Sequence, residues 1–369
     1  MSDFNQRVIR LSKLAAYIKH HAKVKQPVMI WGPPGVGKSE VVDQIRLSYP
    51  GKTKLIDMRL SLYEPTDLRG YPVPDMESKQ MIWFPPSDLP TEQDAKEYDH
   101  IVLLLDELNG AMPATLLSAY QLILNRKLGS YTLPDNVIVV AAGNRESDKG
   151  VTYRMPKPLA NRFVHYEVAA NYDDWFDWAV NNNIHPDVIG YITVNKQSLY
   201  TFDPKSAERS FATPRSWTFV SNLLHDSDYL SSDEITDMVA GTIGDGLAVQ
   251  FKAHRAISTK LPNPSHILNG TVTELKTKEI SAMFTLTTSM AYELKSKHDQ
   301  MGREVSEAEF LQMMDNCFGF WMKNFEPEMI VMSVKMLFSK YNVNTNINLR
   351  KMANWPEFMK GYGDLIASA

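Results

Sequence analysis

The sequence predicts an α/β fold in which a parallel β-sheet core is followed by helical regions. From residue 28 to about residue 170, short apolar runs alternate with segments of helical apolar spacing. That order is typical of a sheet whose parallel strands are joined by helices. After about Ala170 the strand pattern ends, and apolar residues recur at helical spacing toward residue 369. The strand candidates are Val28–Trp31, Lys54–Met58, Ile101–Leu105, Val137–Ala142 and Val164–Val168.

Residues 1–25 precede the first strand candidate and are predicted to form an amphipathic helix. Apolar side chains fall on one side of this helix and basic side chains on the other. The apolar side comprises Val8, Ile9, Leu11, Leu14 and Ile18.

A glycine-rich loop joins the first strand candidate to the helix that follows it. Residues 32–39 match the phosphate-binding pattern G-x-x-x-x-G-K-[ST], in the strand–loop–helix context that the pattern needs. Its glycines let the backbone wrap a phosphate, with N–H groups pointing inward at a helix N-terminus. Lys38 would bridge the β- and γ-phosphates, and the Ser39 hydroxyl would ligate Mg²⁺. The predicted nucleotide-binding residues are Gly32, Pro33, Pro34, Gly35, Val36, Gly37, Lys38 and Ser39.

A long segment, Leu60–His100, separates the second and third strand candidates. It is rich in proline and carries Trp83 and Phe84. A loop of this length inside a compact core either has a function or contains small elements of its own.

Polar residues end two later strand candidates. Ligands of an open α/β sheet lie at the carboxyl ends of its strands, so Asp106 is predicted to lie beside the Mg²⁺ that Ser39 binds. Glu107, one residue further, could polarise a water for in-line attack on the γ-phosphate. Asn144 follows the next strand candidate and could orient that water. Simple turn residues are the alternative interpretation of all three.

Two arginines are candidates for contact with the γ-phosphate. Arg162 precedes the last strand candidate, and Arg215 follows Pro214, which suits a helix start. A guanidinium stabilises the negative charge that develops in phosphoryl transfer. A surface ion pair explains each arginine equally well from the sequence alone.

Composition sets further limits on function. The 369 residues carry a net charge of −4 and a single cysteine, Cys317. The charge gives no basic signature for nucleic acid. One cysteine excludes an intrachain disulfide, and we expect it to be buried as a small apolar residue. The N-terminus lacks a signal-peptide pattern and no apolar run is long enough to span a bilayer, so we expect a cytoplasmic protein.

The second half of the chain is predicted to form two helical regions, separated at the Leu261-Pro-Asn-Pro-Ser sequence. Methionine and aromatic residues recur at helical spacing in the last hundred residues, where core packing is the favoured interpretation. They are Met313, Met314, Phe318, Phe320, Trp321, Met322, Met329, Met332 and Met336.

In the order of these motifs the chain resembles the AAA+ ATPases, specifically the MoxR-type branch that includes the CbbQ/NorQ-like activators. Residues 32–39 match Walker A, Leu103–Glu107 matches Walker B, and Asn144 matches sensor 1. Arg162 matches the arginine finger, and Arg215 matches the sensor 2 arginine of the lid. The family often has Asp-Arg-Phe where this chain has Asn-Arg-Phe, and Arg145 and Arg154 lie near enough in sequence to compete for the finger role.

The resemblance implies a domain plan. Residues 1–170 would be the α/β nucleotide-binding core, with a helix-2 insert at about 60–100 and a hairpin before sensor 1 at about 126–136. Residues 171–265 would form a helical lid. Residues 266–369 would be an extra helical extension, for which no family motif gives an account.

The resemblance also implies an activity. It indicates ATP hydrolysis with Mg²⁺ in a ring, usually a hexamer, in which Arg162 acts on the nucleotide of a neighbouring subunit. Family members commonly work with a von Willebrand factor A domain partner and remodel or activate a client protein. A nucleic-acid-dependent motor or loader is the alternative function, and a nucleotide-binding module without hydrolysis conflicts with the intact Glu107.

Overall fold

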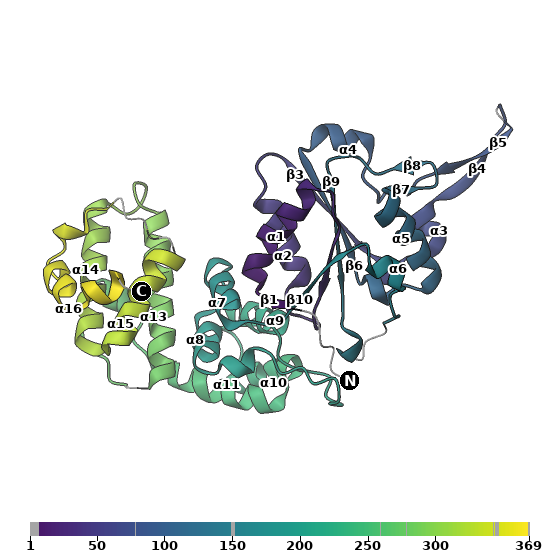
Figure 1. The fold of residues 1–369 in the computed structure, drawn as a ribbon. Helices are drawn as coiled ribbons and strands as arrows, with labels where there is room; N and C mark the ends of the chain where they lie inside the picture. Colours follow the sequence, from purple (N-terminus) through teal and green to yellow (C-terminus); the bar gives the residue numbers. More distant parts are fainter. Residues whose placement is uncertain are drawn as a thin grey trace. The chain divides into compact units, whose positions relative to one another are not determined.

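The structure is a computed structural model that describes residues 7–77, 79–148, 152–258, 260–277, 279–341, 343 and 347–367. The described chain divides into two compact units (Figure 1). Unit 1 runs to Asn171 and includes Asp203–Ser206, and unit 2 contains Tyr172–Phe202 and the residues from Ala207 onward. Each unit is considered by itself.

Unit 1 is built on a parallel sheet with the strand order β1-β10-β2-β9-β6-β3. The five strand candidates are confirmed, and two of them have the bounds that the sequence indicated. The sheet strands are β1 (Val8–Ile9), β2 (Val28–Trp31), β3 (Thr53–Arg59), β6 (His100–Asp106), β9 (Val137–Gly143) and β10 (Val164–Val168). The helices of unit 1 are α1 (Leu11–Lys23), α2 (Lys38–Leu47), α3 (Pro65–Arg69), α4 (Glu92–Glu97), α5 (Pro113–Asn125) and α6 (Lys157–Ala160).

The prediction of a helix over residues 1–25 is only partly right. The helix begins at Leu11, and Val8 and Ile9 instead form strand β1, which pairs in parallel with β10. Residues 1–6 lie outside the described part of the chain. The edge of β10 offers unpaired backbone groups, and their pairing favours an extended conformation that the local sequence does not reveal.

Two hairpins extend the core. Strands β4 (Tyr71–Asp75) and β5 (Gln80–Phe84) pair within the proline-rich segment, and their hairpin projects away from the sheet of unit 1 (Figure 1). Strands β7 (Lys127–Leu128) and β8 (Tyr131–Thr132) form the short hairpin expected at about 126–136. The long segment between β3 and β6 therefore contains small elements of its own.

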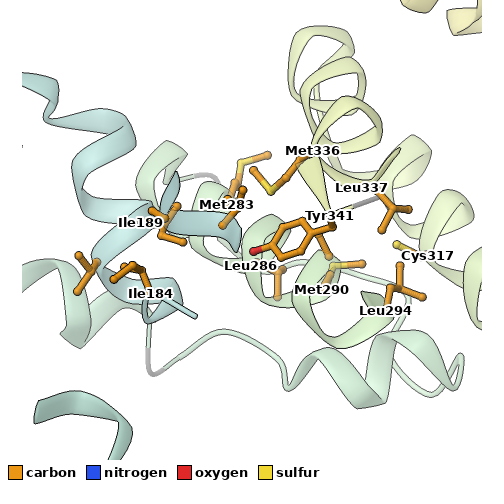
Figure 2. Close-up of a cluster of buried hydrophobic side chains, with 14 of the residues drawn as sticks. Ile184, Ile189, Met283, Leu286, Met290, Leu294, Cys317, Met336, Leu337 and Tyr341 are labelled. Carbon is orange, nitrogen blue, oxygen red and sulfur yellow. The ribbon is translucent and has the colours of Figure 1, made fainter. Parts of the chain in front are cut away.

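In the described residues of unit 2 the regular elements are helices, joined by irregular segments and accompanied by one isolated β-bridge between Met301 and Val305. A single apolar core contains residues of both the predicted lid and the predicted extension, for example Ile189 and Met290 (Figure 2). The division at residue 265 stays a prediction, since both segments contribute to that one core. The helices are α7 (Tyr172–Asn181), α8 (Pro186–Val194), α9 (Pro214–His225), α10 (Ser232–Ile243), α11 (Asp245–Ser258), α12 (Pro264–Leu268), α13 (Ile280–Asp299), α14 (Glu307–Asn324), α15 (Pro327–Lys335) and α16 (Trp355–Ala367).

The sulfur-containing and aromatic residues of unit 2 pack as the sequence indicated. Met314, Phe318 and Trp321 are fully buried on α14. Cys317, on the same helix, is also fully buried, and burial raises the pKa of its thiol. A buried, protonated thiol is unreactive, so the role of Cys317 is to pack in the core. Among the described residues, no helix combines the length and apolar character needed to cross a membrane.

Candidate nucleotide site

The glycine-rich loop connects the end of β2 to the start of α2. Gly37 caps the helix with a φ of 99°, a left-handed conformation that glycine adopts without steric cost. Gly32 packs so closely against β10 that a Cβ atom there would lie 2.8 Å from Cγ2 and 2.9 Å from the carbonyl oxygen of Val168. The loop thus presents backbone N–H groups at a helix N-terminus, which favours an anionic ligand.

The Lys38 ammonium lies at the centre of this loop. Its Nζ donates hydrogen bonds to the carbonyl oxygens of Gly32 at 2.7 Å and Pro33 at 3.0 Å, and to Oδ1 of Asn144 at 3.0 Å. Two residues that the sequence predicted for the same site, Lys38 and Asn144, are therefore in direct contact. Their chain positions differ by 106 residues, and the adjacent strands β2 and β9 bring them together.

Ser39 and Asp106 form the second contact that the sequence predicted. The Ser39 hydroxyl donates to Oδ2 of Asp106 at 2.8 Å, and the other carboxylate oxygen accepts the backbone N–H of Glu107, also at 2.8 Å. A hydroxyl and a buried carboxylate are hard oxygen ligands, and Mg²⁺ is commonly held by such a pair together with substrate phosphates. The two side chains fit the cation that the motif implies.

Glu107 is held in place by a residue that the sequence analysis missed. The Ser61 hydroxyl donates a short hydrogen bond to the Glu107 carboxylate. Ser61 lies in the short 3₁₀ helix Leu60–Leu62, which follows strand β3, the neighbour of β6 in the sheet. The sequence signal that could have identified Ser61 is a hydroxyl residue shortly after the carboxyl end of a predicted strand. Glu107 itself has a φ of 52°, a conformation that non-glycine residues adopt at a cost of about 1–3 kcal/mol and that is frequent at functional sites.

A third carboxylate adds to the negative charge at this edge of the sheet. The pKa of Asp57, on β3, is raised first by its partial burial and then by the charge of Asp106, with a smaller contribution from Glu107. Arg59 opposes this increase. A divalent cation between Ser39 and Asp106 would relieve the repulsion among these groups.

Asn144 is also fixed through its main chain. The Asn109 amide donates to the Asn144 carbonyl oxygen at 2.8 Å, and Asn109 is itself buried. Asn109 lies in the turn after Glu107, so it joins the ends of β6 and β9. This second residue that the sequence analysis missed holds the backbone of Asn144, and leaves the Asn144 amide free to face Lys38.

The arginines near Asn144 differ in their surroundings. Arg145 forms ion pairs with Asp148 at 3.1 Å and Glu167 at 2.9 Å, all within unit 1. Arg154 and Arg162 are exposed. Arg145 is thus engaged in stabilising its own unit, which favours the other two for contact with another molecule.

Arg162 lies far from the loop that binds phosphate. It is part of a turn that precedes β10, whereas the loop follows the carboxyl end of β2. Since Val164 pairs with Val28, Gly32 and Arg162 are separated along the strands by about six residues, or roughly 20 Å. That distance exceeds the length of an arginine side chain. The structure does not bring Arg162 to Lys38 of the same chain.

Arg215 belongs to unit 2. Pro214 is the first residue of α9, and Thr213 caps the helix by accepting the backbone N–H of Ser216 at 3.0 Å. The side chain of Arg215 is exposed at this helix N-terminus. Its role as a sensor 2 arginine stays a prediction.

The fold and the site define the class of protein. The phosphate loop, the acidic end of β6 and Asn144 occupy the carboxyl ends of adjacent strands of one parallel sheet, in the order of the Walker A, Walker B and sensor 1 motifs. Unit 1 has the fold and the site arrangement of a P-loop nucleotide-binding domain.

Known proteins resemble this chain only distantly in sequence. No family model matches the chain. The chain is similar to midasin of Giardia intestinalis, with 26% identity over 218 residues, and this region is 54% of the chain but only 4% of midasin.

Two solved structures also resemble the chain. A putative ATPase from Cytophaga hutchinsonii has 11% identity and a TM-score of 0.34, covering 97% of this chain and 90% of that one. NtrX from Brucella abortus in complex with ADP has 15% identity and a TM-score of 0.38, covering 95% and 68%. Because these TM-scores are low, the two solved structures do not support the assignment of unit 1 as a nucleotide-binding domain. That assignment depends on the strand order and the site.

Proposed function

We propose that this chain is a MoxR-type AAA+ ATPase that hydrolyses ATP with Mg²⁺ in a ring of identical subunits, and that the ring remodels or activates a client protein. The observation that carries the proposal is the arrangement of charged groups in unit 1. The carboxyl ends of the strands carry four groups of the site, Lys38, Ser39, Asp106 and Glu107. Arg162 is exposed at the other end of the strands, before β10 begins.

Each group at the carboxyl ends of the strands has a role in phosphoryl transfer. Lys38 would exchange its contacts with the loop carbonyls and Asn144 for phosphate oxygens. Ser39 and Asp106 would hold Mg²⁺, which neutralises charge on the β- and γ-phosphates. Glu107 would accept a proton from the attacking water at a carboxylate oxygen, while the Asn144 amide orients that water.

Arg162 would complete the site from a second subunit. Its separation of roughly 20 Å from Gly32 along the strands disfavours contact with a phosphate bound by the loop of its own chain. An exposed guanidinium at the other end of the strands can stabilise transition-state charge in the nucleotide site of a neighbouring subunit if the subunits are arranged head to tail. Such an arrangement closes into a ring, which we expect to be a hexamer.

Mixing of two inactive variants tests this assignment. Lys38→Ala removes a phosphate contact but keeps Arg162, and Arg162→Ala has the reverse defect. Each variant alone is expected to lose turnover, and a mixture of the two should regain a fraction of it, because some interfaces then contain both intact groups. No recovery in the mixture contradicts the role of Arg162 in a neighbouring site. Arg154→Ala in the same assay tests the competing arginine.

The β4–β5 hairpin supports a protein client. By strand register Tyr71 pairs with Phe84 and Val73 with Ile82, and these four side chains are 44–61% exposed on one face. Exposed apolar patches of this kind mark interaction sites. We expect a von Willebrand factor A domain protein to be a partner of the ring.

Nucleic acid is the competing partner. The net charge of −4 disfavours it. The ATPase rate measured with and without DNA at two salt concentrations decides between the alternatives. Strong stimulation by DNA that disappears at higher salt would replace the chaperone function by that of a nucleic-acid motor.

A further inference from the structure

Strand β10 carries side chains that connect the phosphate loop to the turn containing Arg162. His165 is the second residue of this strand. It contacts one residue on the neighbouring strand β2 and one residue in the segment that precedes β10. The Trp31 indole Nε1 donates to Nδ1 of His165 at 2.8 Å, and Nε2 of His165 lies 2.7 Å from the carbonyl oxygen of Ala160. An indole N–H can only donate, so Nδ1 accepts and Nε2 carries the hydrogen that Ala160 accepts.

The two partners of His165 occupy particular places in the chain. Trp31 is the last residue of β2 and directly precedes Gly32 of the phosphate loop. Ala160 ends α6, and its carbonyl oxygen also accepts the backbone N–H of Phe163 at 3.2 Å. This hydrogen bond closes a four-residue turn in which Arg162 is the third residue. One imidazole thus connects the residue before the loop to the turn that positions Arg162.

A second connection to β10 begins at Lys38. The Lys38 ammonium donates to Asn144, and Arg145, the next residue, forms an ion pair with Glu167 at 2.9 Å. Glu167 is on β10 and pairs in register with Trp31. The first connection begins at the residue before Gly32 and the second at Lys38, and both lead to the strand that starts after Arg162.

We propose that His165 is a positioning residue that couples the phosphate loop of a subunit to the orientation of its own Arg162. Nucleotide binding moves the end of β2, Trp31 displaces the imidazole, and His165 shifts the Ala160 carbonyl and the turn closed by it. The nucleotide held by one subunit would then control how well its Arg162 reaches the site of the next. This inference rests on the proposed action of Arg162 in a neighbouring subunit.

A pair of variants of similar size separates hydrogen bonding from packing. His165→Gln keeps one acceptor and one donor close to the positions of the imidazole nitrogens, whereas His165→Leu has neither. Trp31→Phe removes only the donor to His165. His100→Gln, at the start of β6 on the same sheet, is the control for replacing a histidine. Steady-state turnover and binding of a fluorescent ATP analogue are measured for the full chain.

We expect Trp31→Phe to lower kcat by about five- to tenfold, as for the loss of one hydrogen bond. His165→Leu, which removes two hydrogen bonds, should lower kcat at least as much, and both variants should keep KM and nucleotide affinity within twofold. His165→Gln should retain at least half of the turnover, and His100→Gln should match the native chain. Equal turnover in the Leu and Gln variants, or a parallel loss of nucleotide affinity, overturns the proposal.

The Arg162→Ala background distinguishes this inference from the proposed function. If His165 acts through Arg162, the Leu and Gln variants should have the same residual rate once Arg162 is absent. A rate ratio that persists in that background shows that His165 acts on the site of its own subunit and overturns the coupling. Full turnover in Arg162→Ala alone instead refutes the proposed role of Arg162.

Discussion

Replacement of Glu107 by glutamine tests the central step of the proposed chemistry. Glutamine has nearly the same shape as glutamate, so its Oε1 can still accept the Ser61 hydroxyl. The contact between Ser39 and Asp106 does not involve Glu107 and should persist. The amide cannot accept a proton from water. The structure therefore predicts loss of catalysis with retention of the fold and of nucleotide binding.

The expected loss can be estimated from general-base catalysis. A positioned base contributes about 100- to 10,000-fold to the rate, or about 3–5.5 kcal/mol of transition-state stabilisation. Phosphate release at saturating ATP should fall by this factor, while binding of a fluorescent ATP analogue changes less than about threefold. Glu92→Gln, an exposed glutamate on α4, is the matched control and should leave both quantities unchanged. Turnover of the Glu107 variant within threefold of the native rate would remove Glu107 from the role of base.

The remaining predictions concern stability. Gly32→Ala places a Cβ within 2.8 Å of Val168, so we expect it to lower the Tm of unit 1, at a cost of about 1–3 kcal/mol. Gly241→Ala on α10, where nothing lies within 4 Å, should raise the Tm of unit 2 as for a helical glycine. Burial lowers the pKa of His185 from 6.5 to about 4. Between these values the unfolded state binds more protons, so the stabilisation present above pH 6.5 is lost as the pH falls to 4. His185→Asn keeps an acceptor for the Asp187 N–H and should flatten this pH dependence in calorimetry. Equal Tm values for Gly32→Ala and the native chain, or an unchanged pH profile for His185→Asn, contradict the respective argument.

The local elements of the core could be predicted from the sequence. The run Val137–Ala142 is apolar throughout and begins with four β-branched residues, which is typical of a parallel strand buried on both faces. In the structure it lies within β9, between β2 and β6. The phosphate loop is predicted from the spacing of its residues and from its place between a strand and a helix, since its conformation depends on glycines at fixed positions. Val8 and Ile9 were misassigned to a helix because strand β1 exists only through pairing with β10.

The contacts that orient the side chains could not be predicted in this way. Ser61 and Glu107 are 46 residues apart in the chain, and Trp31 and His165 are 134 apart. Neither pair has a local pattern, because each contact depends on which strands become neighbours in the sheet. The same is true of the core that α8 shares with α13, where Ile189 and Met290 belong to segments that the sequence assigned to different regions.

The sequence by itself predicted the candidate nucleotide site. Residues 32–39 are predicted from motif spacing, and Asp106, Glu107 and Asn144 from their places after apolar strand candidates, because such constraints on backbone and charge are encoded locally. Only the tertiary structure decided how these groups are oriented and that Arg162 lies at the opposite end of the strands. The reason is that strand direction and register fix the distance from Arg162 to Gly32, and these properties arise when separate segments pair and bury their apolar faces together.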